Sequence, residues 1–223
     1  MRAGKRVCDF VFALLLALLI SPLLLVIILA LLIFQGGNPF FLQERVGRGC
    51  RNFNIIKFRT MTSARDAEGN LLPDEERTTW IGSFLRASSL DELPELINVL
   101  IGDMSFIGPR PWIPEQMSTF DTVTRRYRMR IRPGISGLAQ VRGRNNLTFR
   151  QRVCYDLRYA RQLSLWLDIR ILFRTLWKVA VSEGIAQRVD ALGPVPSAMP
   201  KDPETKGMRG NKPRRFSQKI STL

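Results

Sequence analysis

A long hydrophobic run, from Phe10 to Phe34, constrains this chain more than any other feature of its sequence. As one straight helix, its roughly 25 residues would reach about 37 Å, which is enough to cross a bilayer. The run is too long for the apolar core of a signal peptide, and no small-x-small cleavage site follows it. We therefore expect residues 1–36 to form a helical membrane anchor.

The middle of this run is interrupted by Ser21 and Pro22. Proline removes a helical backbone hydrogen bond, and the serine can bond back to a carbonyl and stabilise a bend. Basic residues flank the run on both sides, namely Arg2, Lys5, Arg6, Arg45, Arg48, Arg51 and Lys57. Because positive charge stays on the cytoplasmic side, the simplest topology is a re-entrant helix that returns to the side it entered. A plain spanning helix with a kink is the alternative, and these features leave it open.

The charge balance of the chain points to an anionic partner. Lys and Arg number 34 against 19 Asp and Glu, which gives a formal net charge of +15. The chain has no histidine, so any metal would be held by carboxylate oxygens, which favours Mg²⁺ or Mn²⁺. The three cysteines lack metal-ligand spacing, so their pattern indicates neither a zinc site nor a disulfide framework.

Residues 37–190 have the pattern of a small, mostly helical domain with a short β element, which is an α+β fold. Residues 52–61 alternate as a strand does, with Lys57 and Arg59 on one face. Residues 63–78 are polar and predict a surface loop or a short helix. Two helices are expected next, the second running from Asp91 to Leu100.

The acidic pair Asp91 and Glu92, within SSLDELPEL, has two interpretations. It can be a helix cap, because Ser89-x-x-Glu92 matches the capping-box pattern. Proline is tolerated in the first helical turn, so Pro94 should be the third helical residue, with Asp91 near the N-cap. Asp91 would then lie at the positive end of the helix dipole, which also attracts phosphate, so a reaction centre is the second interpretation.

Arg110 lies between Pro109 and Pro111, which make its backbone stiff and extended. A guanidinium on a rigid loop can grip a phosphate with two parallel hydrogen bonds, although a solvated arginine is the alternative. Further along, five arginines (Arg125, Arg126, Arg128, Arg130 and Arg132) precede RPGISGLAQV. The arginines are typical of a solvated face, and the glycine-rich stretch could form an anion nest. We see no nucleic-acid-binding module and expect no nucleic-acid partner.

Residues 164–184 predict an amphipathic helix. Arg170, Arg174 and Lys178 form one cationic stripe, and apolar residues cover much of the rest, namely Trp166, Ile169, Phe173, Leu176, Trp177 and Ala180. Such a helix can lie among anionic lipid headgroups, or it can pack on the core of the protein. Residues 191–223 are rich in Pro, Lys, Arg, Ser and Gly and predict a disordered basic tail.

Taken together and in this order, these segments closely resemble the bacterial sugar transferase family, the monotopic polyprenyl-phosphate phosphoglycosyl transferases. The segments are the run with Ser21-Pro22, NPFFLQERVGRG, KFRTM, SLDELPEL, GDMSFIGPRP, RPGISGLAQV and DLRYARQLSLWLDIRIL. The likeness extends from about Lys5 to Gly184. Only a few residues precede the hydrophobic run, so the resemblance is to the minimal, catalytic-core form of the family.

The resemblance implies a reaction. A sugar-1-phosphate would pass from a UDP-sugar to undecaprenyl phosphate, releasing UMP and forming a polyprenyl diphosphate sugar. This would be the first membrane step of bacterial glycoconjugate assembly. It also implies Mg²⁺, and a catalytic domain on the cytoplasmic face of the inner membrane.

The resemblance implies site residues as well. Asp91 would be the nucleophile that forms a covalent phosphosugar intermediate, with Glu92 as its partner. Asp91 would also hold the Mg²⁺, and the break of the re-entrant anchor would fall at Ser21-Pro22. The expected phosphate-binding residues are Arg110, Lys57, Arg59 and Arg132.

The rival hypothesis is a non-catalytic, basic scaffold that binds acidic lipid at the membrane. It explains the charge and both membrane-active segments. It does not explain the acidic pair, the rigid arginine and the glycine-rich stretches together. The sequence specifies neither the sugar nor the pathway, and it leaves a homo-oligomer open.

Overall fold

A computed structural model describes residues 3–143 and 146–180, and it has the predicted mixture of helices and short strands. The predicted basic tail, residues 191–223, lies outside the described residues. The helices are α1 (Ala3–Phe34), α2 (Asp74–Arg77), α3 (Trp80–Ser88), α4 (Glu95–Ile101), α5 (Pro114–Ser118), α6 (Thr122–Arg128), α7 (Leu138–Arg142), α8 (Phe149–Arg161) and α9 (Leu165–Ala180). The strands are β1 (Phe40–Val46), β2 (Asn52–Phe58), β3 (Ser105–Ile107) and β4 (Gly134–Ser136). The described residues also include the 3-10 turns η1 (Arg48–Cys50) and η2 (Leu90–Glu92).

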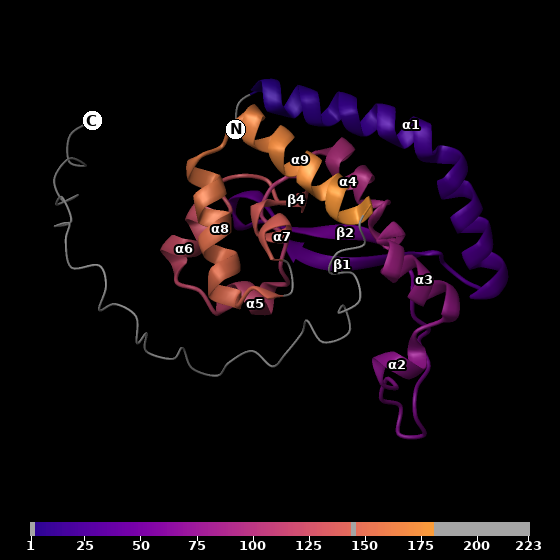
Figure 1. Cartoon of the computed structure of the whole chain (residues 1–223). Helices are drawn as coiled ribbons and strands as arrows, with labels where there is room; N and C mark the ends of the chain where they lie inside the picture. The colour runs from indigo at the N-terminus through magenta and orange to yellow at the C-terminus, as the bar shows by residue number, and fades with distance from the viewer. Residues whose placement is uncertain (1–2, 144–145, 181–223) are drawn as a thin grey trace, which may run out of the picture. The chain divides into compact units, whose positions relative to one another are not determined.

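Helix α1 continues through Pro22 without ending, and Figure 1 shows that it bends along its length. The Ser21 hydroxyl donates to the carbonyl of Leu18 at 2.8 Å, the local bond expected of a serine beside a proline kink. Within the described chain, α1 is the single helix long and apolar enough to cross a membrane, and most of its surface is exposed. A helix with so much apolar surface in contact with solvent is typical of a membrane anchor.

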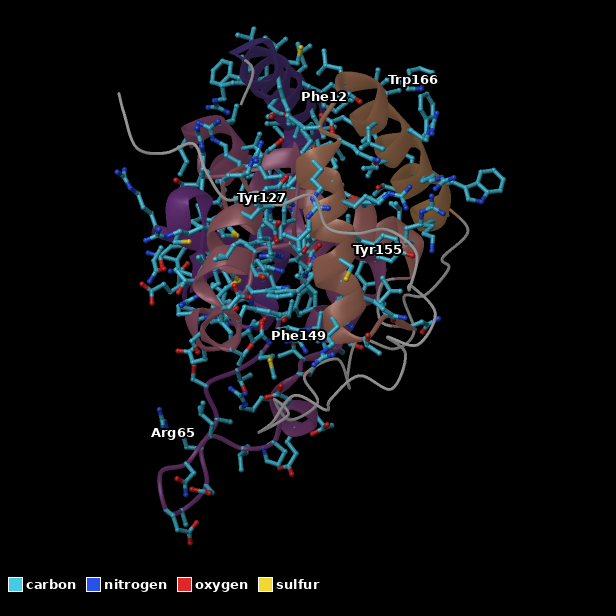
Figure 2. The ribbon with its side chains drawn as sticks, turned by 90° about the vertical axis from the view of Figure 1, so that its left-hand side faces the viewer. Phe12, Arg65, Tyr127, Phe149, Tyr155 and Trp166 are labelled. Atoms are coloured by element: carbon cyan, nitrogen blue, oxygen red, sulfur yellow. The ribbon has the colours of Figure 1, made fainter. Side chains whose placement is uncertain are left out.

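The buried face of α1 packs on the body of the protein at two places. Near its start, Ala13 packs beside Val99 of α4, and Phe12 meets the ring of Phe106 edge-on at 5.0 Å (Phe12 is labelled in Figure 2). Near its end, Ile27 and Leu31 join a second apolar cluster that includes Phe58, Ile81 and Leu85. The anchor and the body therefore share their apolar core along the length of the helix.

A buried polar network connects the start of α1 to β3, α8 and α9. Lys5 Nζ donates to Asp168 Oδ2 at 2.7 Å, and the hydroxyl of Tyr159 donates to Asp168 Oδ1 at 2.6 Å. The hydroxyl of Ser105 donates to Asp9 Oδ2 at 2.7 Å. All five side chains are buried, so losing one charged partner would leave an uncompensated charge inside the protein. The network therefore fixes where α1 enters the body.

Strands β1 and β2 form an antiparallel hairpin in which Phe41 lies opposite Lys57. The predicted strand was too long, because β2 ends at Phe58 and Arg59 follows it. The loop after β2 projects from the body and carries α2 (Figure 1), with Arg65 near its tip (Figure 2). This agrees with the polar loop or short helix predicted for residues 63–78.

Strands β3 and β4 form a small parallel pair, with Ser105 opposite Gly134. The backbones approach so closely that a Cβ on Gly134 would lie 2.1 Å from the Gly108 nitrogen. The Gly134 N–H donates to the carbonyl of Pro109 at 3.0 Å, so it is not available to an anion. The predicted anion nest is therefore wrong at Gly134, where the glycine serves close packing.

Helix α9 packs on the body along one face, as one interpretation of its sequence predicted, and leaves its other face exposed. Asp168 and Ile171 are buried against the body, whereas six large apolar side chains are exposed, namely Leu165, Trp166, Ile169, Phe173, Leu176 and Trp177. Figure 2 shows Trp166 projecting outward from the helix. One face of α9 is thus part of the core, and the other is apolar surface without a partner in the described chain.

Candidate active site

Three of the predicted site residues meet at one carboxylate oxygen. Glu92 Oε1, in η2, lies 2.9 Å from Lys57 Nζ on β2 and 2.7 Å from Arg110 Nη2 in the loop after β3. The Glu92 side chain is 10 % exposed, so both contacts are partly shielded from water. Glu92 therefore fixes the spacing between an ammonium group and a guanidinium group that face the same site.

The acidic pair does not cap a helix in the way that the sequence predicted. Helix α4 begins at Glu95, with Pro94 as its N-cap residue, and Asp91 lies earlier, in η2. The difference arises at Ser89, which ends α3 in the left-handed conformation at φ 62°, so that a separate turn precedes the next helix. The prediction of Asp91 at the N-cap and Pro94 at the third helical position is therefore wrong. Asp91 is buried in a turn that places it beside Glu92.

A third carboxylate, Glu95, belongs to the same cluster, and the sequence analysis missed it. Its Oε1 lies 3.2 Å from Lys57 Nζ, and its side chain is 2 % exposed. Burial raises the pKa of Glu95 to about 7, against the opposing effect of the Lys57 charge. The signal was present in SLDELPEL, where a third acidic residue follows the pair within four positions.

Arg45, on β1, is a third cation near the cluster, and from the sequence it was interpreted only as a charge flanking the hydrophobic run. Its Nη1 donates to the carbonyl of Pro111 at 3.4 Å. Burial, together with the charge of Arg110, lowers the pKa of Arg45 to about 10. In the opposite direction, Glu92 above all, and then Glu95 and Asp91, raise the pKa of Arg110. The site thus gathers three cations around the carboxylates, which suits a substrate with several phosphate charges.

The other two predicted phosphate ligands lie elsewhere. Arg132 Nε donates to the carbonyl of Gly102, just after α4, at 2.5 Å, and burial lowers its pKa, as do the charges of Arg6 and Arg48. Arg59 lies beside Gly37, just after α1. The structure does not bring these two residues to Glu92 as it does Lys57 and Arg110.

A buried ion pair between Arg128 and Asp156 supports the backbone of the loop that carries Arg110. Arg128 is 1 % exposed, and it donates from Nε to Asp156 Oδ2 at 2.8 Å and from Nη2 to the carbonyl of Arg110 at 2.6 Å. Its guanidinium lies 4.0 Å from the ring centroid of Trp112, which stacks on Phe149 (labelled in Figure 2) at 4.4 Å. The predicted solvated face is therefore wrong at Arg128, which is a buried support of the Arg110 backbone.

A cavity of about 200 Å³ opens beside Glu92 and Arg110. Its lining comes from α1, α4, α7, α9 and the two parallel strands and is mostly apolar, including Leu16, Leu93, Leu96, Phe106, Ile135 and Val141. Lys178 and a few uncharged polar side chains complete it. A mostly apolar cavity with a guanidinium in its lining fits a ligand that joins a hydrocarbon chain to a phosphate.

The donor set fits Mg²⁺ only in partnership with a substrate. In the part of the chain that the structure describes, no three acidic or cysteine side chains converge closely enough to hold a metal ion by themselves. Mg²⁺ usually takes one or two carboxylates and completes its coordination with substrate phosphates and water. Asp91, which lies beside Glu92 in η2, can supply such a carboxylate.

The comparison with known proteins decides the family. The sequence model described as bacterial sugar transferase matches residues 1–182. The chain belongs to the bacterial sugar transferase family. The predicted resemblance is therefore confirmed, and so is the expectation of a transferase.

Individual relatives of this transferase agree over most of its length. An uncharacterized sugar transferase, EpsL of Bacillus subtilis, is 42% identical over 183 residues, which are 82% of this chain and 90% of EpsL. The exopolysaccharide production protein ExoY of Sinorhizobium fredii is 35% identical, over 81% of this chain and 87% of ExoY. A UDP-glucose:undecaprenyl-phosphate glucose-1-phosphate transferase of Caulobacter vibrioides is 42% identical, over 77% of this chain and 68% of that protein.

Proposed function

We propose that the protein transfers a sugar-1-phosphate from a UDP-sugar to undecaprenyl phosphate, releasing UMP and forming a polyprenyl diphosphate sugar. The named activity of the Caulobacter relative supports this substrate pair. The observation that carries the proposal is that Lys57 and Arg110 both contact Glu92, and that Glu92 and Arg110 also line a mostly apolar cavity to which α1 contributes. A diphosphate and a hydrocarbon chain would each meet a matching surface there.

In the proposed first step, an oxygen of the Asp91 carboxylate forms a bond to the phosphorus that carries the sugar. The bond from that phosphorus to the bridging oxygen breaks, and UMP leaves with the electron pair. In the second step, a phosphate oxygen of the lipid acceptor attacks the same phosphorus and displaces Asp91. Two displacements at the same phosphorus, with the Asp91 carboxylate as the intermediate carrier, replace one difficult transfer between two anions.

The other residues of the site position and neutralise the phosphates. Arg110 can bind two phosphate oxygens through its planar fork, and Lys57 adds a compact charge nearby. Glu92 holds both cations in place through one oxygen, which makes it the partner of Asp91 in this account. Bound Mg²⁺, held by Asp91 together with the substrate diphosphate, would supply further neutralisation of the charge that develops on the leaving phosphate.

We also propose that α1 is re-entrant and that the catalytic body lies on the cytoplasmic face of the bacterial inner membrane. The bend of α1, the Ser21 bond within it and the basic residues at both ends support this topology. The exposed apolar and cationic residues of α9 support its contact with a membrane that contains anionic lipids. Both segments would then face the same leaflet.

The test is a reconstitution of the reaction. The full-length protein is incubated with Mg²⁺, polyprenyl phosphate and each of a panel of UDP-sugars, and the release of UMP is measured. We expect UMP with at least one sugar, in an amount that depends on polyprenyl phosphate. If no sugar of the panel gives UMP, the proposed transfer from a UDP-sugar to polyprenyl phosphate is contradicted.

A matched pair of variants tests the role of Arg110 in the same assay. Arg110→Lys keeps the charge but loses the bidentate fork, so we expect activity to fall by about tenfold or more. Arg126→Lys is the control, because Arg126 is exposed on α6. Equal activities of the two variants would contradict a role of Arg110 in binding the substrate phosphate.

A further inference from the structure

A second cavity, of about 100 Å³, lies between α7, α8 and α9 and has no role in the proposed reaction. Four arginines line it, Arg142 of α7, Arg158 of α8, and Arg170 and Arg174 of α9. Its remaining lining consists of Leu138, Tyr155, Gln162, Leu167 and Ile171, so none of its lining residues in the described chain is acidic. We call this cavity the arginine pocket. Figure 2 labels Tyr155 on α8 and Trp166 on α9, the two longer helices that bound it.

Within the described residues, the four guanidinium groups of the pocket have no anionic partner. In residues 3–143 and 146–180, no ion pair connects any of the four to an acidic side chain. Arg170 lies 5.8 Å from the ring centroid of Trp166, and Arg158 has a long contact of 3.5 Å with Gln162. Four like charges around one cavity repel each other, so an anion bound between them would lower the electrostatic energy.

The size and the chemistry of the arginine pocket select the anion. Arginine forks match the oxygens of a phosphate, with two parallel bonds from each guanidinium. The volume of about 100 Å³ is half that of the cavity beside Glu92, so the arginine pocket suits a smaller group. A single phosphate group, attached to something that continues outside the pocket, fits better.

The surroundings of the pocket indicate what that phosphate is attached to. Arg170 and Arg174 share α9 with the exposed side chains of Ile169, Phe173 and Trp177. A helix with tryptophans and apolar residues beside basic residues places the basic groups at the level of lipid phosphates. We propose that the arginine pocket binds the phosphate of an anionic phospholipid headgroup. The proposal uses the membrane contact of α9 but not the transferase reaction, because the two cavities share no lining residue.

Native mass spectrometry of the full-length protein in detergent tests this inference, with phosphatidylglycerol as the probe and phosphatidylcholine as the neutral comparison. The test variant is Arg142→Gln/Arg158→Gln, which leaves the cationic stripe of α9 intact. The control is Arg51→Gln/Arg126→Gln, which removes the same charge at two exposed positions outside the pocket. All four substituted residues are exposed, so both variants should fold, and circular dichroism checks this.

We expect the wild type and the control to retain bound phosphatidylglycerol in preference to phosphatidylcholine. The affinity of the test variant for phosphatidylglycerol should be lower by roughly tenfold or more, because charge-assisted hydrogen bonds to the phosphate are lost. Equal losses in the test and control variants, or equal retention of both lipids by the wild type, would overturn the proposal.

Two further experiments refine the assignment. One distinguishes a lipid phosphate from a soluble phosphate, and the other distinguishes binding by guanidinium groups from binding by positive charge alone. Glycerol-3-phosphate at the same concentration as the lipid should not displace phosphatidylglycerol, and complete displacement would overturn the assignment to a lipid.

The variant Arg142→Lys/Arg158→Lys keeps both charges and loses both planar guanidinium groups, the forks. We expect its affinity to lie between those of the wild type and the glutamine variant, and an affinity equal to that of the wild type would contradict recognition by the forks.

Discussion

At the scale of single residues, the site depends on how one lysine is shared. Lys57 Nζ contacts Glu92 Oε1 at 2.9 Å and Glu95 Oε1 at 3.2 Å, so a single cation serves two carboxylates. Glu95 is the more deeply buried of the two, and its charge is the more costly to maintain. Its raised pKa therefore makes the stability of the protein depend on pH.

The first prediction concerns Glu95→Gln, which removes the titration of this carboxyl and preserves its shape. A carboxyl whose pKa rises from 4.5 in the unfolded chain to about 7 in the folded protein binds a proton more tightly when folded. The free energy of unfolding of the wild type should therefore fall as pH rises from 4.5 to about 7. Above about pH 7 the contribution of Glu95 to this free energy should no longer change with pH. The difference in melting temperature between the variant and the wild type should grow in favour of the variant across this window. A constant difference would contradict the raised pKa.

The residues of the site divide into those that the sequence could predict and those that it could not. Glu92 and Arg110 were predicted from the acidic pair and the Pro-Arg-Pro stretch, and Lys57 from the family resemblance, and the structure brings the three together. Glu95 was missed because its importance comes from burial, which depends on the packing of α1 and β2 around it. The buried position of Arg128 was missed for the same reason, since its partner Asp156 is 28 residues away.

At the scale of elements, the loop 109–111 depends on its support from α6 and α8. Arg128 of α6 connects Asp156 of α8 to the Arg110 carbonyl, and the rings of Trp112 and Phe149 pack beside it. Burial raises the pKa of Asp156, against the lowering effect of Arg128. The ion pair thus positions Arg110 through its backbone, while the Arg110 side chain faces Glu92.

The second prediction separates this positioning role from simple stability. Arg128→Met leaves Asp156 buried without its partner and should cost about 3–5 kcal/mol of unfolding free energy. Arg128→Met/Asp156→Leu removes both charges and should recover much of that stability. It still lacks the bond to the Arg110 carbonyl, so we expect its turnover to stay several-fold below that of the wild type. Full recovery of both stability and turnover in the double variant would show that the pair is only structural.

The third prediction concerns the path of α1 and uses cysteines that the chain already has. Cys8, near the start of α1, and Cys50, after β1, are both free and exposed. In single-cysteine variants with the other cysteines replaced by serine, an impermeant maleimide should label both positions only in inside-out vesicles. A spanning α1 would instead expose Cys8 and Cys50 on opposite sides of the membrane, and labelling on opposite sides would contradict the re-entrant proposal.

The boundaries of the elements show where sequence patterns lose accuracy. The length and apolarity of α1 and the amphipathic pattern of α9 were clear in the sequence, because both patterns extend over several turns. The start of α4 was wrong by four residues, since the left-handed conformation of Ser89 inserts a turn that no periodic pattern reveals. The pairing of β3 with β4 connects segments far apart in the chain, which local patterns do not encode.

At the scale of the whole molecule, the cationic side chains behind the formal charge of +15 form groups with different roles. Lys57 and Arg110 face the carboxylates of the candidate active site. Lys5 and Arg128 are buried in ion pairs that hold elements together. The arginines of the arginine pocket belong neither to the candidate active site nor to a buried ion pair among the described residues, and we assign them to lipid phosphate. The net charge predicted an anionic partner, but it could not distinguish active-site cations from structural ion pairs or from the arginine pocket.

The proposed reaction depends above all on Asp91 as the nucleophile of a two-step transfer. Asp91→Asn keeps the shape of the side chain in η2 but removes the charge that attacks phosphorus, so turnover should fall by roughly 10³-fold or more. The control is Glu115→Gln, at an exposed position of α5, which should retain normal turnover.

The most direct measurement is the intact mass of the full-length protein after mixing with Mg²⁺ and the active UDP-sugar, in the absence of polyprenyl phosphate. We predict a mass increase equal to one sugar phosphate, which maps to the peptide containing Asp91, disappears on addition of polyprenyl phosphate and is absent in Asp91→Asn. An adduct on another residue, or normal turnover by Asp91→Asn, would contradict the claim.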